Sequence, residues 1–391
     1  MRKFALICAS ILLTLGASIF FYKALEKNQE AGHASPSIRP IAEFEATYAV
    51  ALSEELLNRE SGILLLKEIL SAGAKVYLFR KDEILPSSGK QVPPDPRITQ
   101  EEWALVTPIQ IDHESFWLRD YLPIPLLKLY PQLPATPSFL DFVYRDAKSF
   151  DDVAMYQFAL AIDSSIEHLP IVLDGGNFMT DGETCIVTQD LKSDTSTPHA
   201  RDLKTQELLS LVQNALGCHT LEAVTAIPHP HVDMWMKFIG KGHVLINQIE
   251  DRTLALAKSL SPEEQQRIME IQKALDQTAT HLGHTLKVSR IPMPLPIEST
   301  FLTYANAVIV NHKIVFPSYS PGLQKNAESP DSSLYKEYET RMAEFARSAG
   351  FESSFINADQ LIHEGGAFHC VSYHLNNLEE IATMERNTKK L

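Results

Sequence analysis

The sequence predicts an α/β fold built from several units of similar architecture. Two patterns lead to this prediction. Pairs of strand-like segments turn at glycine, aspartate or asparagine, and segments of helical periodicity alternate with these pairs along the chain. This alternation favours one mixed fold over separate helical and all-strand parts. The units share no readable sequence repeat, so the repetition concerns architecture alone.

Four segments are expected to be helices, at residues 53–73, 205–216, 261–282 and 333–350. In the first, Ser53 is a candidate N-cap and Gly73 a candidate end. A serine oxygen accepts an unpaired backbone N–H, and glycine tolerates the left-handed closing position. The third begins S-x-E-E at Ser261, which is a common helix start.

The expected strands are single segments at residues 76–79 and 106–111, three hairpins at 171–188, 231–248 and 301–319, and a last strand at 367–375. The last strand follows Gly365 and Gly366 and carries Cys370. Strand geometry would fix the direction of its sulfur, which suits a nucleophile. A buried structural cysteine is the alternative at this position.

Length and composition limit the class of protein. The chain has 391 residues, enough for one large domain or two ordinary ones, and 45% hydrophobic with 21% charged residues is a globular composition. The net charge of −14 argues against nucleic acid as a partner, because phosphates require a basic surface. An acidic surface is compatible with a cationic substrate.

The four cysteines do not define a scaffold. They are too few for a disulfide-rich fold, and none forms a CxxC pair that would suggest zinc. Cys185 and Cys218 can pair in an oxidising compartment, which the sequence alone does not decide.

Residues 1–22 are predicted to be an N-terminal signal or membrane anchor. Two positive charges precede an apolar run that, as a helix, would span about 28 Å, close to the thickness of a bilayer core. The run exceeds the apolar part of most cleaved signals, which favours an anchor. Residues 23–40 are predicted to be a linker and residues 41–391 the folded domain. The domain is expected to be exported and to meet the membrane only through the N-terminal segment.

Several polar residues interrupt otherwise apolar segments. Trp117 and Asp120, expected at a strand end, can grip a flat cation, because the ring stacks on it and the carboxylate accepts its N–H groups. A surface pair of Arg119 with Asp120 is the alternative. Asp174 starts the first hairpin, where a plain turn also explains it. Asn306 lies in an apolar strand and needs hydrogen-bond partners if buried.

His231 and Asp233 alternate on a predicted strand and therefore share a face. A histidine moves protons near neutral pH, and a carboxylate beside it binds cations or raises the imidazole pKa. His229 and His231 also alternate, which allows metal ligation. No further ligand run follows, and no metal site is expected.

A cysteine, a histidine and at least two carboxylates suit the hydrolysis of a guanidinium group. The planar guanidinium stays protonated and matches a bidentate carboxylate. The bound cation lowers the thiol pKa by charge proximity, and the thiolate can attack the central carbon. The adduct then needs an acid for the departing ammonia and a base for water.

Five motifs resemble those of agmatine deiminases and bacterial peptidylarginine deiminases, in the same order. They are WLRD at 117–120, LDGGN at 173–177, HVD at 231–233, YAN at 304–306 and GGAFHC at 365–370. PIAEFE at 40–45 is also similar to the start of agmatine deiminases. The resemblance covers roughly residues 41–375. It implies a pentein fold, an α/β-propeller of about five ββαβ-like units around a central active-site channel, and no cofactor.

The resemblance implies catalytic roles for four residues. Cys370 would be the nucleophile, and His231 the general acid and base. Asp120 and Asp233 would hold the guanidinium between them.

Four further residues are expected at the substrate: Trp117, Asp174, Asn306 and Arg145. Asp174 stands where the family carries a longer glutamate that supports the histidine, and Asn306 matches an asparagine near the nucleophile. Arg145 lies in a segment similar to one that holds a substrate carboxylate with two arginines, of which one is evident here.

The expected substrate is a guanidino compound or peptide, with peptidyl-arginine or a C-terminal arginine first and agmatine second. The stretch GGNFMTDG at 175–182 is similar to the exported peptidylarginine branch, and an exported enzyme meets peptides. Transfer of the amidino group to an amine, or non-catalytic binding of arginine-like cations, remain as alternatives.

Overall fold

The computed structural model describes most of the predicted domain. The described residues are 36–81, 95–130, 135–144, 150–194, 203–227, 229–296, 300–321, 323 and 332–377. The expected anchor at residues 1–22, most of the linker and Arg145 lie outside them, so these expectations stay predictions. Within the described ranges, no helix is both long and apolar enough to cross a membrane.

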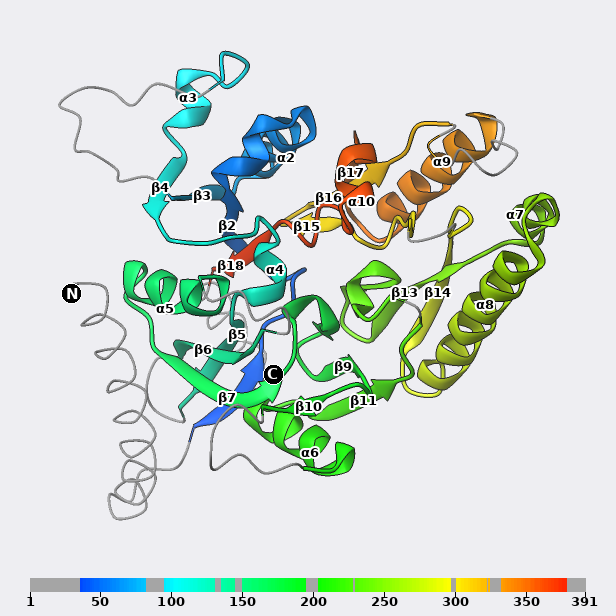
Figure 1. The fold of residues 1–391 in the computed structure, drawn as a ribbon. Helices are drawn as coiled ribbons and strands as arrows, with labels where there is room; N and C mark the ends of the chain where they lie inside the picture. Colours follow the sequence, from blue (N-terminus) through cyan, green and yellow to red (C-terminus); the bar gives the residue numbers. More distant parts are fainter. Residues whose placement is uncertain are drawn as a thin grey trace, which may run out of the picture.

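The strands of the described residues form five sheets, and each sheet contains the same unit. An antiparallel strand pair is joined through a helix to a third strand, which pairs parallel to the second. In Figure 1 the five units surround a common centre, and their helices lie toward the outside. The observed ββαβ units therefore agree with the predicted propeller.

The units follow one another along the chain. The first contains β18 (Tyr373–Asn376), β2 (Thr47–Ser53), α2 (Glu60–Ser71) and β3 (Lys75–Arg80), extended by β4 (Val106–Gln110). The second contains β5 (Ile124–Leu129), β6 (Thr136–Val143), α5 (Asp151–Ala161) and β7 (Ile166–Val172), with β1 (Ser37–Pro40) and β10 (Lys192–Ser193) at its edges. The third contains β8 (Phe178–Thr180), β9 (Thr184–Thr188), α6 (Thr205–Leu216) and β11 (Thr220–Val224).

The fourth unit contains β12 (Met236–Gly240), β13 (His243–Gln248), α8 (Pro262–Leu282) and β14 (Lys287–Pro292). The fifth contains β15 (Val308–Val310), β16 (Lys313–Ser318), α9 (Ser332–Ser348) and β17 (Glu352–Asn357). Short helices lie between these elements: η1 (Glu54–Asn58), α3 (Gln100–Trp103), α4 (Leu118–Tyr121), η2 (Gly175–Asn177), η3 (Val232–Met234), α7 (Asp251–Leu254), η4 (Ala255–Ser259) and α10 (Asp359–His363).

The first unit closes the ring, because it pairs the end of the domain with its beginning. β18 runs antiparallel to β2, with His374 opposite Val50. This pairing brings the segment before β18 against the segment after β4, where the N–H of Arg119 donates to the carbonyl of Cys370 at 3.1 Å.

Each long helix packs an apolar stripe on its sheet. In α8 the buried residues recur three or four positions apart, at Ile268, Ile271, Leu275, Thr278 and Leu282. This spacing keeps one helical face toward the core and leaves the charged face in water. The predicted helix 261–282 is therefore confirmed, with Ser261 as its N-cap.

The first predicted helix needs a correction. Residues 53–73 form η1 and α2 rather than one helix, because Arg59 between them is extended. Ser53 caps η1 by accepting the N–H of Glu55, and Gly73 follows α2 at a φ of 84°. The N-cap at Ser53 and the end at Gly73 are thus located as expected, and the helix is interrupted at Arg59 between them.

The predicted hairpins exist, but each begins late. Their first strands start at Phe178, Met236 and Val308, and the last strand starts at Tyr373. The residues before them form η2, η3 and bends. Glycine, aspartate and asparagine gather in these segments and favour turns over strands. Cys370 consequently lies in a turn and not in the predicted strand.

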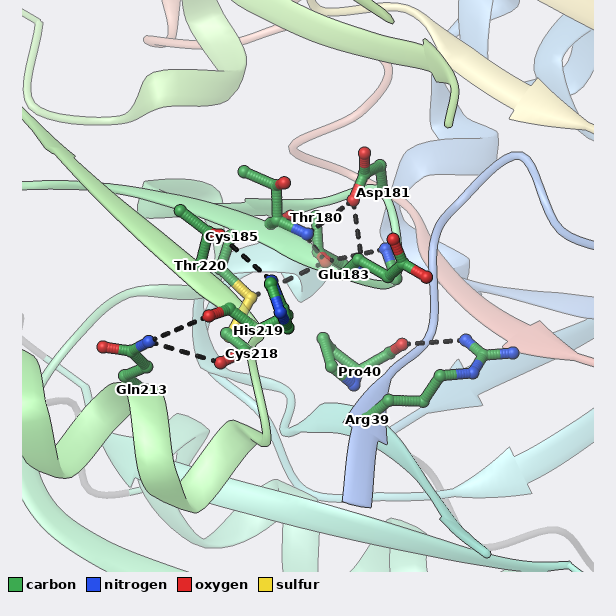
Figure 2. Close-up of a disulfide and its surroundings, with 12 residues drawn as sticks. Arg39, Pro40, Thr180, Asp181, Glu183, Cys185, Gln213, Cys218, His219 and Thr220 are labelled. Carbon is green, nitrogen blue, oxygen red and sulfur yellow. Dashed lines mark hydrogen bonds between the residues drawn. A yellow bond between two sulfur atoms is a disulfide. The ribbon is translucent and has the colours of Figure 1, made fainter. Parts of the chain in front are cut away.

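Cys185 and Cys218 form a disulfide between β9 and the end of α6, and the bond closes a sequence separation of 33. Figure 2 shows this bond beside β1. Gly217 ends α6 at a φ of 69°, and a Cβ there would lie 2.0 Å from the carbonyl oxygen of Ile38. Glycine is therefore required for β1 to pass this corner.

Candidate active site

The predicted site residues lie on five turns, one before the first strand of each unit. Asp120 lies on α4, Asp174 directly before η2, His231 and Asp233 at η3, Asn306 in the bend before β15, and Cys370 in the turn before β18. The five units form a ring, so turns at corresponding places meet at its centre. The polar residues interrupt the sequence pattern because they belong to this centre and not to the strands.

Two local predictions are wrong although the residues reach the site. His231 and Asp233 do not alternate on a strand, since Val232 to Met234 form a 3-10 helix after an extended His231. Asp120 lies on the short helix α4 and not at a strand end. The surface pair of Arg119 with Asp120 does not form either, because the Arg119 Nη2 lies 3.0 Å from Nδ1 of buried His374.

Asn306 organises the turn that carries Cys370. Its Oδ1 accepts the backbone N–H groups of Ala367 and His369, both at 3.1 Å. Its Nδ2 lies 3.1 Å from the Cys370 Sγ. One buried amide therefore fixes both the backbone of the turn and the position of the sulfur.

Two glycines permit the close approach of the site residues. A Cβ at Gly366 would lie 2.8 Å from Cζ3 of Trp117 and 2.9 Å from the Cys370 Sγ. A Cβ at Gly176 would lie 2.8 Å from Nδ1 of His231. A side chain at either position would displace a site residue, because Gly366 lies against both the Trp117 ring and the Cys370 sulfur.

His231 lies between two carboxylates. Its Nε2 is 3.0 Å from Asp174 Oδ2, and its Nδ1 is 3.4 Å from Asp120 Oδ1. Burial lowers the imidazole pKa, but these carboxylates and Asp233 outweigh burial and raise the pKa of His231 to about 9. The histidine is thus protonated at neutral pH and can act as an acid. Asp174 reaches it despite being shorter than the family's glutamate.

Asp120 and Asp233 each present a buried acceptor. In the described part of the chain, Oδ1 of neither residue makes a hydrogen bond. Burial raises the pKa of Asp120 to about 7 against the opposing charge of His231. Buried carboxylate oxygens are costly without donors, and a planar cation with several N–H groups supplies them.

The thiol of Cys370 is buried beside these charges. Its Sγ lies 3.6 Å from Asp233 Oδ2, and the side chain is 3% exposed. Burial, with the negative charges of Asp233 and Asp120, raises the pKa of the Cys370 thiol well above its usual range. A cation bound to the two carboxylates would reverse the charge effect and favour the thiolate.

A second polar group behind Asp233 was not predicted from the sequence. The His369 ring lies between Asp233 and Glu43, and Nζ of buried Lys237 also bonds Glu43. Two signals were available. Glu43 lies in the PIAEFE segment that resembles the family, and His369 immediately precedes Cys370.

Ring architecture and polar centre define the class of protein: a pentein whose central residues are a cysteine, a histidine and several carboxylates. A family model described as Porphyromonas-type peptidyl-arginine deiminase matches residues 63–375. The chain belongs to this family.

Curated relatives carry the name of agmatine deiminase. A Marinomonas sp. (strain MWYL1) protein provisionally given that name is 24% identical over 261 residues, covering 60% of this chain and 64% of the relative. The agmatine deiminase of Pseudomonas fluorescens is 23% identical over 235 residues, covering 51% of this chain and 56% of the relative. The matches thus span less than two thirds of these relatives.

Solved structures share the fold over most of the chain. An agmatine deiminase of Enterococcus faecalis aligns with a TM-score of 0.63 at 16% identity, covering 88% of this chain and 98% of that one. A Porphyromonas gingivalis protein provisionally titled arginine deiminase aligns with a TM-score of 0.62 at 17% identity, covering 87% and 98%. These similarities establish the pentein fold.

Proposed function

We propose that this protein hydrolyses a guanidino group to a ureido group and releases ammonia. One observation carries the proposal. Cys370, His231, Asp120 and Asp233 belong to one buried cluster, which joins a nucleophile, an acid and two carboxylates that can accept from a planar cation.

The reaction has two halves, in which a C–S bond to Cys370 is first formed and then hydrolysed. In the first, the Cys370 thiolate forms a C–S bond to the guanidinium carbon, His231 gives its proton to one nitrogen, and that C–N bond breaks to release ammonia. In the second, His231 takes a proton from water, and the hydroxide forms a C–O bond to the same carbon. The C–S bond then breaks, the sulfur keeps the electron pair, and the hydroxyl proton leaves to solvent.

Agmatine is the first candidate substrate, because the curated relatives carry the name of agmatine deiminase. Peptidyl-arginine or a C-terminal arginine is the second. The family description supports it, as do the predicted N-terminal signal or anchor and Arg145 in the sequence. The Cys185–Cys218 disulfide also supports an exported location, where oxidising conditions maintain such bonds.

Product assays separate these candidates. We expect N-carbamoylputrescine and ammonia from agmatine, and comparison with citrulline formation on short arginine peptides ranks the two substrates. Turnover of peptides alone would reject agmatine. Ornithine formed from arginine without ammonia would indicate amidino transfer instead.

Cys370→Ser tests the mechanism itself. We expect turnover to fall by at least about 10³-fold while the guanidino ligand still binds, since the carboxylates remain. Equilibrium binding measured by calorimetry provides the control for folding. Ammonia release at the wild-type rate in this variant would refute the covalent mechanism.

A further inference from the structure

His369 bridges two carboxylates, that of buried Asp233 and that of partly buried Glu43. Its Nδ1 lies 2.6 Å from Asp233 Oδ2, and its Nε2 lies 2.9 Å from Glu43 Oε2. The side chain is 3% exposed, so water offers it no alternative partners. Ionised carboxylate oxygens only accept hydrogen bonds, and the bridge is therefore complete when both ring nitrogens donate.

Glu43 is a rigid anchor for this bridge. Its Oε1 accepts the backbone N–H of Ile309 at 2.8 Å, and its Oε2 bonds Nζ of Lys237, whose side chain is 2% exposed. Burial would raise the carboxyl pKa, but the charges of Lys237 and His369 hold the pKa of Glu43 well below its usual range. A fixed negative charge thus holds the far nitrogen of His369.

The bridge decides which oxygen of Asp233 is available. Oδ2 accepts from His369, while Oδ1 makes no hydrogen bond to the residues described. Rotation of the carboxylate would break a charge-assisted bond, which is stronger than a bond between neutral groups. Asp233 is also next to the sulfur, so its orientation affects both the cation and the thiol.

We propose that His369 is a positioning residue for deimination: anchored by Glu43, it holds Oδ2 of Asp233 and thereby directs Oδ1 of Asp233 at the N–H groups of the substrate. This role rests on the proposed function for the identity of the substrate. The direction of the carboxylate, however, concerns any amidinium-type cation and can be measured without turnover.

Two amide substitutions separate the two bonds of His369. His369→Asn places an amide nitrogen near the Nδ1 position and can retain the bond to Asp233. His369→Gln places its nitrogen near the Nε2 position and can retain only the bond to Glu43. We expect the Asn variant to keep kcat/KM within about tenfold, and the Gln variant to lose about 10- to 100-fold, mainly through KM, which is the effect of one charge-assisted bond.

His374→Gln is the matched control. His374 also faces Glu43, at 3.5 Å, and it lies on β18, directly after the turn that carries His369, but its described contacts do not include Asp233. We expect this variant to lose thermal stability without a rise in KM. Equal KM increases in the His374→Gln and His369→Gln variants would show that general packing, and not the Asp233 bond, sets KM.

Alkylation of Cys370 tests the carboxylate independently of catalysis. The cationic reagent 2-chloroacetamidine and the neutral 2-chloroacetamide carry the same leaving group, and peptide mass spectrometry measures their rates at this cysteine. We expect the wild-type chain and His369→Asn to prefer the cation, and His369→Gln to lose about 10- to 100-fold of that preference. Glu43→Gln, which keeps the shape of the anchor without its charge, should lose part of it.

The outcomes distinguish the two proposals. The role of His369 would be overturned if His369→Gln kept the wild-type preference for the cationic reagent. It would also be overturned if His369→Asn and His369→Gln lost this preference equally. A wild-type chain that deiminates neither agmatine nor arginine peptides would instead overturn the proposed function, while the alkylation ratios would still decide about His369.

Discussion

Asp120 and Asp233 lie in one buried cluster, and Oδ1 of each makes no hydrogen bond to the described residues, yet their pKa values move in opposite directions. Burial raises the pKa of Asp120 to about 7. Burial acts on Asp233 in the same sense, but the hydrogen bond and charge of His369 outweigh it and lower the pKa of Asp233 below its usual value. Burial alone therefore does not decide the charge state of a carboxylate in this site.

The difference comes from the partners behind each carboxylate. Asp233 accepts from His369 at 2.6 Å, and Glu43 holds that imidazole from its other side. Asp120 is 3.4 Å from the nearest imidazole, that of His231, which it shares with Asp174. Asp233 is thus ionised before a cation binds. Asp120 becomes fully ionised only when the bound cation or a higher pH favours its charged form.

The largest expected effect is that of replacing each of the two carboxylates by an amide. Asp120→Asn and Asp233→Asn should both lower kcat/KM by at least about 10³-fold, because each removes a charged acceptor for the guanidinium. Their stabilities should diverge. Asp233→Asn leaves Nδ1 of buried His369 without its carboxylate partner and should cost about 3 kcal/mol in the free energy of unfolding.

Asp120→Asn should stabilise the free protein at pH 8. The folded pKa of Asp120, about 7, exceeds its ordinary value of 3.8, so stability is lost as pH rises from about 4 through 7. Removal of this titration should add up to about 4 kcal/mol at pH 8, given the shift of about three pKa units. Urea unfolding of both variants is the measurement. Equal destabilisation by the two substitutions would contradict the comparison.

The sequence predicted the reacting groups more completely than their surroundings. Cys370, His231, Asp120, Asp233, Asp174 and Asn306 lie in the five motifs that resemble the family, and the structure brings all six together. The strand assignments at Cys370 and His231 failed, because each site segment turns at the ring centre. Chain order alone does not reveal where five units converge.

His369 and Glu43 were missed for a different reason. Their contact joins the two ends of the domain and depends on the pairing of β18 with β2, which closes the ring. A histidine or glutamate in a single sequence shows its chemistry but not its partner. The difference in pKa between Asp120 and Asp233 therefore follows from the three-dimensional structure and not from the sequence alone.

A smaller effect should appear in the pH profile. We expect kcat/KM for agmatine to rise as pH increases through about 7, where Asp120 ionises, and to fall through about 9, where His231 loses its proton. The two groups interact, so the apparent pKa values of the two limbs belong to the Asp120–His231 pair and not to either residue alone. Asp233 should add no limb in this range.

Asp174→Asn sharpens this assignment. The substitution removes a charge that raises the pKa of His231, so the alkaline limb should move down by about one pH unit while the acid limb moves less. Steady-state kinetics from pH 5 to 10 provide the measurement. An alkaline limb that stays at its wild-type position would exclude His231 as its source.

The smallest effect concerns Asp141, a third buried carboxylate with a histidine partner. Its Oδ2 lies 2.5 Å from Nδ1 of His168, yet burial raises the pKa of Asp141 to about 6. The His168 side chain is 42% exposed, and Glu43 has no counterpart among its described contacts. A hydrogen bond to histidine is therefore insufficient, and the anchored second side of the imidazole distinguishes Asp233.

Asp141→Asn should consequently leave turnover almost unchanged and should not destabilise the protein. The folded pKa of about 6 lies above the ordinary value of 3.8, so the ionised Asp141 lowers stability at pH 8, and the substitution should raise the free energy of unfolding by up to about 3 kcal/mol, given the shift of about two pKa units. Turnover of agmatine should stay within about twofold, because Asp141 lies on β6 and outside the central cluster. If Asp141→Asn instead matched Asp233→Asn in stability loss, any buried aspartate–histidine bond would suffice, and the anchor supplied by Glu43 would not explain why the two site carboxylates differ.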